Sequence, residues 1–235
     1  MSVEQFPVII NVRDRLEPLR QLVEWLEAAG QRELYLLDNA STYPPLLAWL
    51  DRTPHTVVRA ERNLGHRGPW LSGLVPRLGH DRCFVVTDPD VVPVEDCPLD
   101  AIQHFRALFE EVPIVDKIGF GLRIDDLPDH CEHKAEVIAW EQRFWEREVV
   151  PGAYGAAIDT TFALYRPGRG HWFLNSLRTG PPYVARHLSW YVDAANLTDE
   201  QRYYREHADP LTNNWDLERL PARKVRDLLG FTESF

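Results

Sequence analysis

Short apolar runs alternate with helix-forming segments over residues 7–93, and this alternation is what most constrains the fold. Each run has the length of a strand, and the last has the composition of a buried one. The four runs cover residues 7–12, 34–37, 56–60 and 84–93. A strand–helix alternation of this kind forms parallel strands joined by right-handed crossovers. The sequence therefore predicts an α/β fold with a mostly parallel central sheet flanked by helices.

Three helices are predicted between these strands. The first has leucines at helical spacing and ends at Gly30, and Asp14 and Glu17 form a capping-box pattern at its start. The second covers residues 44–50 and opens with a proline, which suits the first helical turn. The third covers residues 69–78. These helices complete the alternation that a parallel sheet requires.

The second half of the chain is less regular. Helices are predicted at residues 100–111, 132–148, 198–207 and 220–229, and strands at residues 117–124 and 158–165. The sequence has no internal repeat, low-complexity tract or linker. We therefore predict a single domain over residues 1–235.

The overall charge narrows the class of partner. The chain of 235 residues has a formal net charge of -10 and no basic run, which argues against a nucleic acid as partner. A single nucleotide needs only a local pocket and stays possible. Cys83, Cys97 and Cys131 are widely spaced and form no CxxC motif, a pattern typical of reduced thiols in a cytosolic protein.

The sequence also bears on the membrane. It opens with no signal-peptide pattern, and no apolar stretch is long enough to cross a bilayer. We therefore expect a cytoplasmic protein without a transmembrane segment. Four basic residues near the end of the sequence could contact anionic lipid at a membrane surface. The simpler interpretation is that they form a solvated helix face. These residues are Arg219, Arg223, Lys224 and Arg226.

The fourth apolar run holds two acids, Asp88 and Asp90, one residue apart where its strand ends. In open α/β sheets ligands bind at the carboxyl edge of the strands. Two adjacent carboxylates repel each other unless a cation or a hydrogen-bonding ligand lies between them. Oxygen ligands of this kind suit Mg²⁺ or Mn²⁺ that holds a diphosphate. The alternative is a helix cap or an acidic turn.

Four motifs at successive strand ends resemble those of the GT-A nucleotide-sugar glycosyltransferases, especially family-2-like members. They are Asn11-Val12-Arg13-Asp14, Asp38-Asn39-Ala40-Ser41-Thr42, Asn63-Leu64-Gly65 and Asp88-Pro89-Asp90, the last similar to the family's DXD motif. Residues 158–166 and 185–188 resemble segments of a group of bacterial glycosyltransferases. The resemblance implies a GT-A (Rossmann-like) fold, with a nucleotide-binding half at residues 1–93 and a mixed α/β acceptor-side half at residues 94–235.

The same resemblance implies a function. The chain is expected to be a metal-dependent glycosyltransferase of the hexosyltransferase class, with Mn²⁺ or Mg²⁺ as cofactor. It would move a sugar from a nucleoside-diphosphate sugar to the hydroxyl of a glycan or lipid-linked acceptor, in bacterial surface glycan synthesis.

Three residues are expected to bind the donor. Asp38 would accept a hydrogen bond from the base, Asn63 would bond to base or ribose, and Arg67 would meet a diphosphate oxygen. The alternatives are a helix cap, an ordinary turn and a surface salt bridge. Further along the chain, Arg186 could face phosphate, and Trp190 could stack on a sugar.

The metal ligands follow the family pattern. Asp88 would face the ribose and bind the metal through water, whereas Asp90 would bind it directly. His187 is our choice for a ligand from the second half, because it lies among cationic and aromatic residues. The alternatives are His171, His207 or no protein ligand there.

An inverting transfer also needs a general base, which takes the proton of the attacking hydroxyl. We assign this role to Asp159, which opens the predicted strand at residues 158–165. A retaining enzyme would need no such base. The rival carboxylates are Asp125, Asp126 and Glu141.

Two other functions stay open. In a haloacid-dehalogenase-type phosphatase, Asp88 would be the nucleophile and Asp90 the acid/base. That motif normally lies on the first strand of its fold, whereas three predicted strands precede it here. The other alternative is a non-catalytic domain that binds a nucleotide or a glycan.

Overall fold

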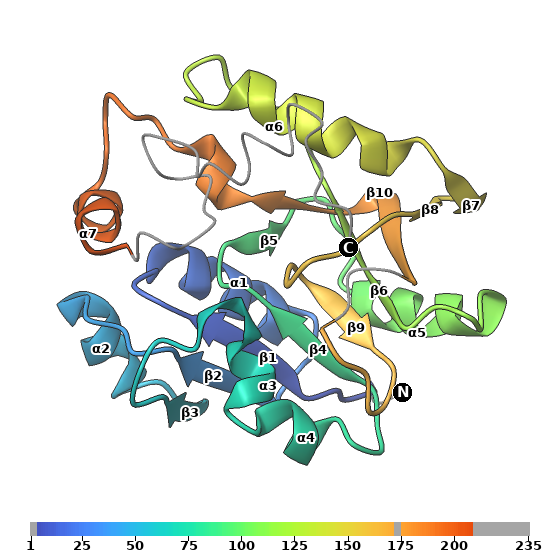
Figure 1. Cartoon of the computed structure of the whole chain (residues 1–235), viewed down its shortest axis with the longest axis horizontal. Coiled ribbons are helices and arrows are strands. Elements are labelled where there is room, and N and C mark those ends of the chain that lie inside the picture. The colour runs from blue at the N-terminus through green and yellow to red at the C-terminus, as the bar shows by residue number, and fades with distance from the viewer. Residues whose placement is uncertain (1–3, 172–174, 209–235) are drawn as a thin grey trace, which may run out of the picture.

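The computed structural model describes residues 4–171 and 175–208, and its strands join in one sheet (Figure 1). In this part of the chain the strand order is β3-β2-β1-β4-β9-β6-β10-β8-β7, and β5 pairs with β10 beside this path. The strands are β1 (Val8–Val12), β2 (Leu34–Asp38), β3 (Thr56–Arg59), β4 (Phe84–Thr87), β5 (Val91–Pro93), β6 (Lys117–Leu122), β7 (Glu148–Val150), β8 (Ala153–Gly155), β9 (Ala163–Tyr165) and β10 (Ser176–His187).

The first four strands are parallel, with β1 between β2 and β4 and with β3 at the edge. The sheet then becomes mixed, because β9 is antiparallel to both β4 and β6, whereas β6 and β10 are parallel. The predicted fold class, an α/β fold around a large central sheet, is confirmed. A single sheet through both halves also supports the proposal of one domain.

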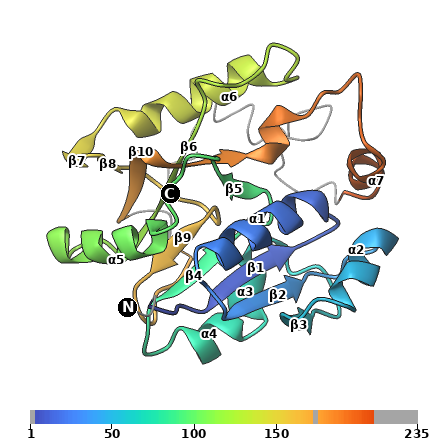
Figure 2. The same ribbon diagram turned by 180° about the vertical axis from the view of Figure 1, so that it is seen from behind.

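Helices cover both faces of the sheet, with α3 and α4 in front of it in Figure 1 and α1 in front of it in Figure 2. The helices are α1 (Glu17–Ala28), α2 (Pro44–Leu50), α3 (Gly68–Leu71), α4 (Leu74–Leu78), α5 (Ala101–Glu111), α6 (Lys134–Glu141) and α7 (Asp199–His207). Short 3₁₀ turns form at η1 (Gly65–Arg67), η2 (Gln142–Trp145) and η3 (Leu188–Tyr191).

Strand β1 is buried on both sides, which explains why all of its residues except Asn11 are apolar. Val8 and Ile10 pack in the cluster that includes α1 and α5 residues, whereas Ile9 packs on the other side with α4 residues. Each leucine that α1 buries against this sheet contributes roughly 1.5–3 kcal/mol to folding. The core therefore fixes β1 at the centre of the first half.

The predicted capping box at the start of α1 is wrong. The N-cap is Leu16, and it makes no side-chain cap bond. Asp14 instead accepts the main-chain N–H groups of Thr42 and Tyr43, at 2.6 and 2.8 Å, just before α2. The first N–H groups of α1 are satisfied by a distant residue, Glu200, as described below. The predicted cap used residues next to α1, whereas the residue that accepts its first N–H groups lies in α7.

The second half departs further from the prediction. The helix expected at residues 132–148 is only α6 followed by η2, after which the chain turns into β7. The strand expected at residues 158–165 begins only at Ala163. Strand β10 was not predicted, because Gly180-Pro181-Pro182 interrupts it, and its register on β6 shifts between Thr179 and Val184.

Helix α7 follows the prediction closely. Thr198 caps it and forms a reciprocal capping box with Gln201. The helix predicted at residues 220–229 and its basic side chains lie outside the described residues. Within residues 4–171 and 175–208, no helix is long and apolar enough to cross a membrane.

Candidate functional site

The carboxyl ends of β1, β2 and β4 meet at one edge of the sheet. Because these strands are parallel, the register Ile10↔Thr87 places Asn11 beside Asp88, and Val12 pairs with Asp38. The sequence motifs that follow these strands therefore come together in space. This edge is our candidate site.

Asp38 is buried at the end of β2. Its carboxylate accepts the N–H of Ser41 at 2.9 Å, and Arg59 Nε lies 3.9 Å from its other oxygen. One oxygen is thus used to shape the turn before α2, although Asp38 does not cap that helix, whose N-cap is Tyr43 without a side-chain cap bond. The other lies near a cation and can still accept from a ligand.

The Asn63-Leu64-Gly65 turn is pinned against this edge by two amide side chains. Asn39 accepts the N–H of Leu64 at 2.7 Å and donates to the carbonyl of Gly65 at 3.0 Å, and Asn11 donates to that same carbonyl at 3.2 Å. Asn63 Oδ1 accepts the N–H of Gly65 and closes the turn. Gly65 has a φ of 65°, which favours glycine.

Asn39 and Asn11 both belong to the sequence motifs, but neither was assigned to the turn at residues 63–65. Asn11 Oδ1 is a buried acceptor that has no hydrogen-bond partner among the described residues. A Cβ on Gly68 would lie only 2.8 Å from this oxygen, so glycine lets α3 approach β1 closely. Asn11 thus combines a structural contact with unused hydrogen-bonding capacity at the edge of the site.

Arg67 is exposed in η1, the turn after the pinned segment. Its charge and that of His66 reach His171, whose pKa lies below its ordinary value because of partial burial and these neighbouring charges. Three basic side chains therefore gather near this end of the site. His171 lies with them and with Trp70, whose ring centroid is 5.7 Å away.

Asp88 is half-buried directly after β4. Its carboxylate accepts the hydroxyl of Thr160 at 2.9 Å. Burial and the charges of Asp90 and Asp159 raise the pKa of Asp88 well above its ordinary value, and the hydrogen bond from Thr160 opposes this shift. Two neighbouring acids thus disfavour the ionisation of Asp88, which is the condition that a cation relieves.

Asp90 is buried and contacts His187. Strands β5 and β10 pair with Val91 opposite His187, and the N–H of Leu188 donates to the Asp90 carbonyl at 2.7 Å. This pairing brings His187 Nε2 to 3.5 Å from Asp90 Oδ1. Burial would raise the pKa of the Asp90 carboxyl, but His187 and Arg15 hold it below its ordinary value.

Two of the predicted metal ligands therefore meet across the boundary between the two halves. Carboxylate oxygens and an imidazole nitrogen are donors that suit Mn²⁺, so the residues present fit such an ion. In the described part of the chain, however, no group of three or more His, Cys, Asp or Glu side chains could hold a metal ion by itself. A cation here would need further oxygen ligands from a substrate or from water.

Asp159 is exposed in the segment of residues 156–162 that precedes β9. The sequence analysis placed Asp159 in a strand, but the strand begins only at Ala163. The charge of Asp159 nevertheless acts on Asp88. Lys117 holds the main chain of this segment from inside, with Nζ donating to the carbonyls of Ile158 and Asp159. The carboxylate of Asp159 is left pointing to solvent beside the acid pair.

The rival carboxylates all have cationic partners. Asp125 accepts from Arg123 at 2.9 Å, Asp126 accepts from Arg186 at 2.7 Å, and buried Glu141 pairs with Arg178. Arg186 also donates twice to Glu95, so its guanidinium is directed toward carboxylates.

The aromatic candidate is buried. Trp190 is 5% exposed and meets the His187 ring edge to face with centroids 5.0 Å apart. It packs against the His187 ring and is too buried to offer a face to a sugar. His207, the other alternative ligand, stacks on Tyr203 in α7.

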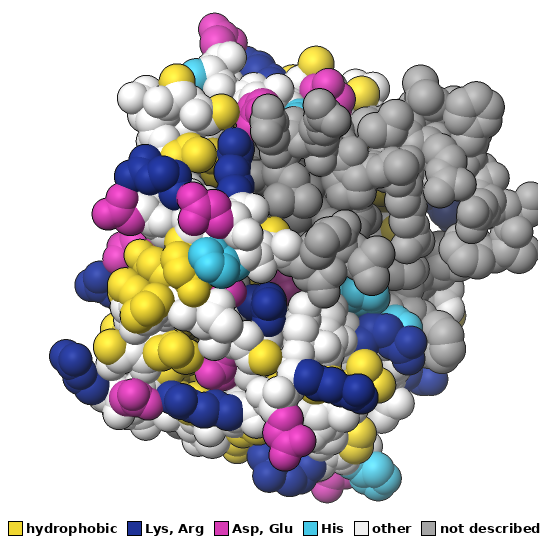
Figure 3. All heavy atoms as spheres, turned by 60° about the vertical axis from the view of Figure 1, so that its left-hand side comes forward, with side chains coloured by type: hydrophobic (Ala, Val, Ile, Leu, Met, Phe, Trp, Pro, Cys, Tyr) yellow, Lys and Arg dark blue, Asp and Glu magenta, His cyan; other side chains and the backbone are white. Residues whose placement is uncertain are grey.

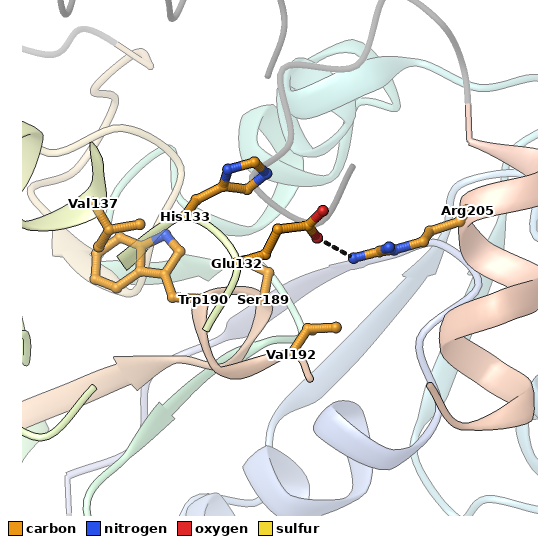
Figure 4. Close-up of a pocket in the computed structure, with 7 residues that line it drawn as sticks. All are labelled: Glu132, His133, Val137, Ser189, Trp190, Val192 and Arg205. Carbon is orange, nitrogen blue, oxygen red and sulfur yellow. Dashed lines mark hydrogen bonds and ion pairs between the residues drawn. The ribbon is translucent and has the colours of Figure 1, made fainter. Parts of the chain in front are cut away.

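A small cavity lies beside His187 (Figure 4). Ser189 links the two, because its hydroxyl lies 3.3 Å from His187 Nδ1. Glu132 and Arg205 close the cavity with an ion pair of 2.9 Å. The lining residues are Glu132, His133, Val137, Ser189, Trp190, Val192 and Arg205.

A second hollow lies between α1 and the residues that lead into β3. None of the predicted site residues lines it. On the face drawn in Figure 3, basic and acidic side chains of the described residues are interspersed.

No protein-family model matches the chain, and no curated protein matches it. Similar solved structures include the mannosyltransferase PcManGT from Pyrobaculum calidifontis in complex with GDP-Man and Mn²⁺, with 14% identity and a TM-score of 0.47. That match covers 95% of this chain and 73% of the other.

Two further structures are similar at the same level. Glucosyl-3-phosphoglycerate synthase from Mycobacterium tuberculosis has 13% identity and a TM-score of 0.46, over 77% of this chain and 70% of that one. Apo UDP-glucose pyrophosphorylase has 10% identity and a TM-score of 0.49, over 87% and 99%. Nucleotide-sugar enzymes are thus among the structures that this fold is similar to.

Proposed function

We propose that the chain is a glycosyltransferase that moves a sugar from a nucleoside-diphosphate sugar to an acceptor hydroxyl. One observation carries this proposal. Asp38, the pinned turn at residues 63–65, Asp88 and Asp90 lie at one edge of a parallel sheet, and His187 joins them from the second half. A nucleotide, a diphosphate and a sugar each need a different part of such an edge.

The donor would lie along the first half of this edge. Asp38 would accept from the base, and Asn63 would bond to base or ribose. Arg67, in a basic cluster with His66 and His171, would contact the diphosphate. The pinned turn supports this role, since its main chain is held in place before any ligand binds.

Asp88, Asp90 and His187 would hold Mn²⁺ or Mg²⁺. When bound, the cation supplies charge neutralisation for the leaving diphosphate. Asp90 and His187 already face each other at 3.5 Å. Asp88 would complete the protein's share, and the diphosphate oxygens and water would supply the rest.

Asp159 would act as the general base of an inverting transfer. The acceptor oxygen forms a bond to the anomeric carbon while the bond to the diphosphate breaks, and the acceptor proton passes to Asp159. The exposure of Asp159 beside Asp88 supports this choice over the paired rivals. The acceptor that we propose is a glycan or lipid-linked molecule of bacterial surface glycan synthesis, at a cytoplasmic location.

Thermal unfolding with UDP-, GDP- and dTDP-sugars, with and without Mn²⁺, tests the proposal. A transferase is stabilised by its own donor in a metal-dependent way, and it then transfers the sugar or slowly hydrolyses the donor. Phosphate release from a generic phosphomonoester, without any sugar donor, would instead favour the phosphatase. Donor binding with neither transfer nor hydrolysis would favour the non-catalytic binding domain.

A further inference from the structure

Lys117 is a buried cation that the proposed chemistry does not use. It opens β6 and is 1% exposed. Its Nζ donates to the carbonyls of Ile158 at 2.7 Å and Asp159 at 3.3 Å, and to the hydroxyl of Tyr165 at 3.3 Å. The three protons of the ammonium therefore have three acceptors, as a buried cation requires.

The segment that Lys117 holds is attached to the interior through a row of main-chain oxygens. Ser176 donates to the carbonyl of Ala156 at 2.6 Å, and Arg178 donates to the carbonyl of Ala157 at 2.8 Å. Lys117 takes the next two carbonyls along the chain. The main chain is thus bound to the interior on both sides of Asp159. Ile158 and Thr160 are buried, whereas the Asp159 side chain between them is exposed.

Two of those side chains reach the candidate site. Thr160 donates its hydroxyl to Asp88 at 2.9 Å. Asp159 is exposed, and its charge raises the pKa of Asp88. The residue that fixes the Asp159 carbonyl therefore also fixes where its carboxylate lies relative to the acid pair.

We propose that Lys117 is a positioning residue for the transfer step, and this rests on the proposed function. Its ammonium holds the carbonyls of Ile158 and Asp159 so that the Thr160 hydroxyl donates to Asp88 and the exposed Asp159 carboxylate stays near enough for its charge to act on Asp88. In this proposal Lys117 itself touches neither the sugar donor nor the sugar acceptor. Its loss acts on the geometry of proton transfer, not on the affinity for the donor.

The surroundings of Lys117 make this role sensitive to pH. Burial lowers the pKa of the ammonium to about 7; Asp159 and Asp116 act to raise it, and Arg178 to lower it. Burial also raises the pKa of Tyr165, so its hydroxyl stays protonated and can donate to the neutral amine. A neutral amine has two protons to donate instead of three, so its hold on the two carbonyls is weaker.

The experiment compares Lys117→Met with Lys134→Met, the same change at a lysine that pairs only with the fully exposed Asp129. Met has a side chain of similar length without the charge, and it leaves the two carbonyls and the Tyr165 hydroxyl without this donor. We expect Lys117→Met to keep the donor dissociation constant and to lower kcat by about 10- to 100-fold, and Lys134→Met to match the wild type in both. Equal kcat values in all three proteins would overturn the proposal.

A second measurement decides the matter if Lys117→Met does not fold. The kcat of the wild type should fall with rising pH around the pKa of Lys117. Tyr165→Phe removes one acceptor of the charged form, so that pKa drops further and the fall in kcat moves to lower pH. An unmoved pH profile in Tyr165→Phe would contradict the proposal.

The two possible failures can be told apart. If the wild type transfers no sugar from any donor, the proposed function is wrong, and the role of Lys117 falls with it. If the wild type transfers sugar and Lys117→Met does so at the same rate, only the role of Lys117 is wrong.

Discussion

The two halves of the molecule place their site residues by different means. In the first half, Asp38 and Asp88 follow parallel strands, and neutral amide side chains pin the turn at residues 63–65. In the second half, buried Lys117 and Arg178 hold the irregular segment that carries Asp159. A regular sheet positions residues by register, whereas an irregular segment needs specific interior partners.

This difference leads to distinct expectations for substitutions. Changes at the strand ends of the first half should remove donor and metal binding. Changes in the segment of residues 156–162 should spare binding and affect transfer.

The largest effect is expected at Asp90. Asp90→Asn keeps the size of the side chain but removes the charge that faces His187. We expect it to abolish stabilisation by donor with Mn²⁺ and to reduce transfer below detection, since a neutral amide is a poor ligand for a hard cation. Thermal unfolding and a transfer assay measure both. The control is Asp96→Asn, at an exposed acid between β5 and α5. Unchanged Mn²⁺ dependence in Asp90→Asn would rule out the assignment.

Asp159→Asn should have the next largest effect. It tests directly whether the second half affects transfer without affecting donor binding. We expect donor affinity to stay the same and kcat to fall by about 10²- to 10⁴-fold, the usual contribution of a general base. Asp125→Asn, at the exposed rival that pairs with Arg123, should have little effect. If the Asp125 variant loses transfer and the Asp159 variant keeps it, the roles are reversed.

The stability of the fold should also depend on pH through Lys117. The pKa of its ammonium is about 7 in the folded chain, against 10.5 ordinarily. Between these values the unfolded chain binds more protons, so the free energy of unfolding rises with pH, by on the order of a few kcal/mol. Below pH 7 both states are protonated and the rise is absent. Denaturant unfolding from pH 6 to 10 should show this rise in the wild type and lose it in Lys117→Met.

The smallest effect concerns the contact that ties α7 to α1. Glu200 accepts the N–H groups of Leu16 and Glu17, at 2.8 and 3.1 Å. Glu200→Ala should lower the free energy of unfolding by about 1–2 kcal/mol, as for other helix caps. Glu206→Ala, on the exposed side of α7, is the control. Equal stability of the two variants would show that the cap contributes nothing measurable.

The first half of the fold was predictable because its signals are local. Each of its strands is an apolar run that ends in a polar motif, so strand β1 and the edge with Asp38 and Asp88 follow from the sequence with the parallel pairing. The helix at residues 44–50 was confirmed to the residue for the same reason. Where a signal lies within a few residues, local preference and final structure agree.

The rest depends on partners far apart in the chain. Nothing near Asp88 in sequence indicates that Thr160 donates to it, and nothing near Leu16 indicates Glu200. Strand β10 was missed because its central glycine and prolines read as a loop, although its two ends pair with β6. Lys117 looked like an ordinary strand residue, since burial of its ammonium depends on the carbonyls of another segment.

The cap that Glu200 provides has a consequence for how the chain folds. The residues it joins are 184 positions apart, so the opening turn of α1 is completed only when α7 arrives. During synthesis, α1 leaves the ribosome early, whereas its acceptor is made much later. The amino-terminal turn of α1 should therefore be the last part of the first half to become protected against hydrogen exchange. Protection of this turn would report that α7 has packed against α1.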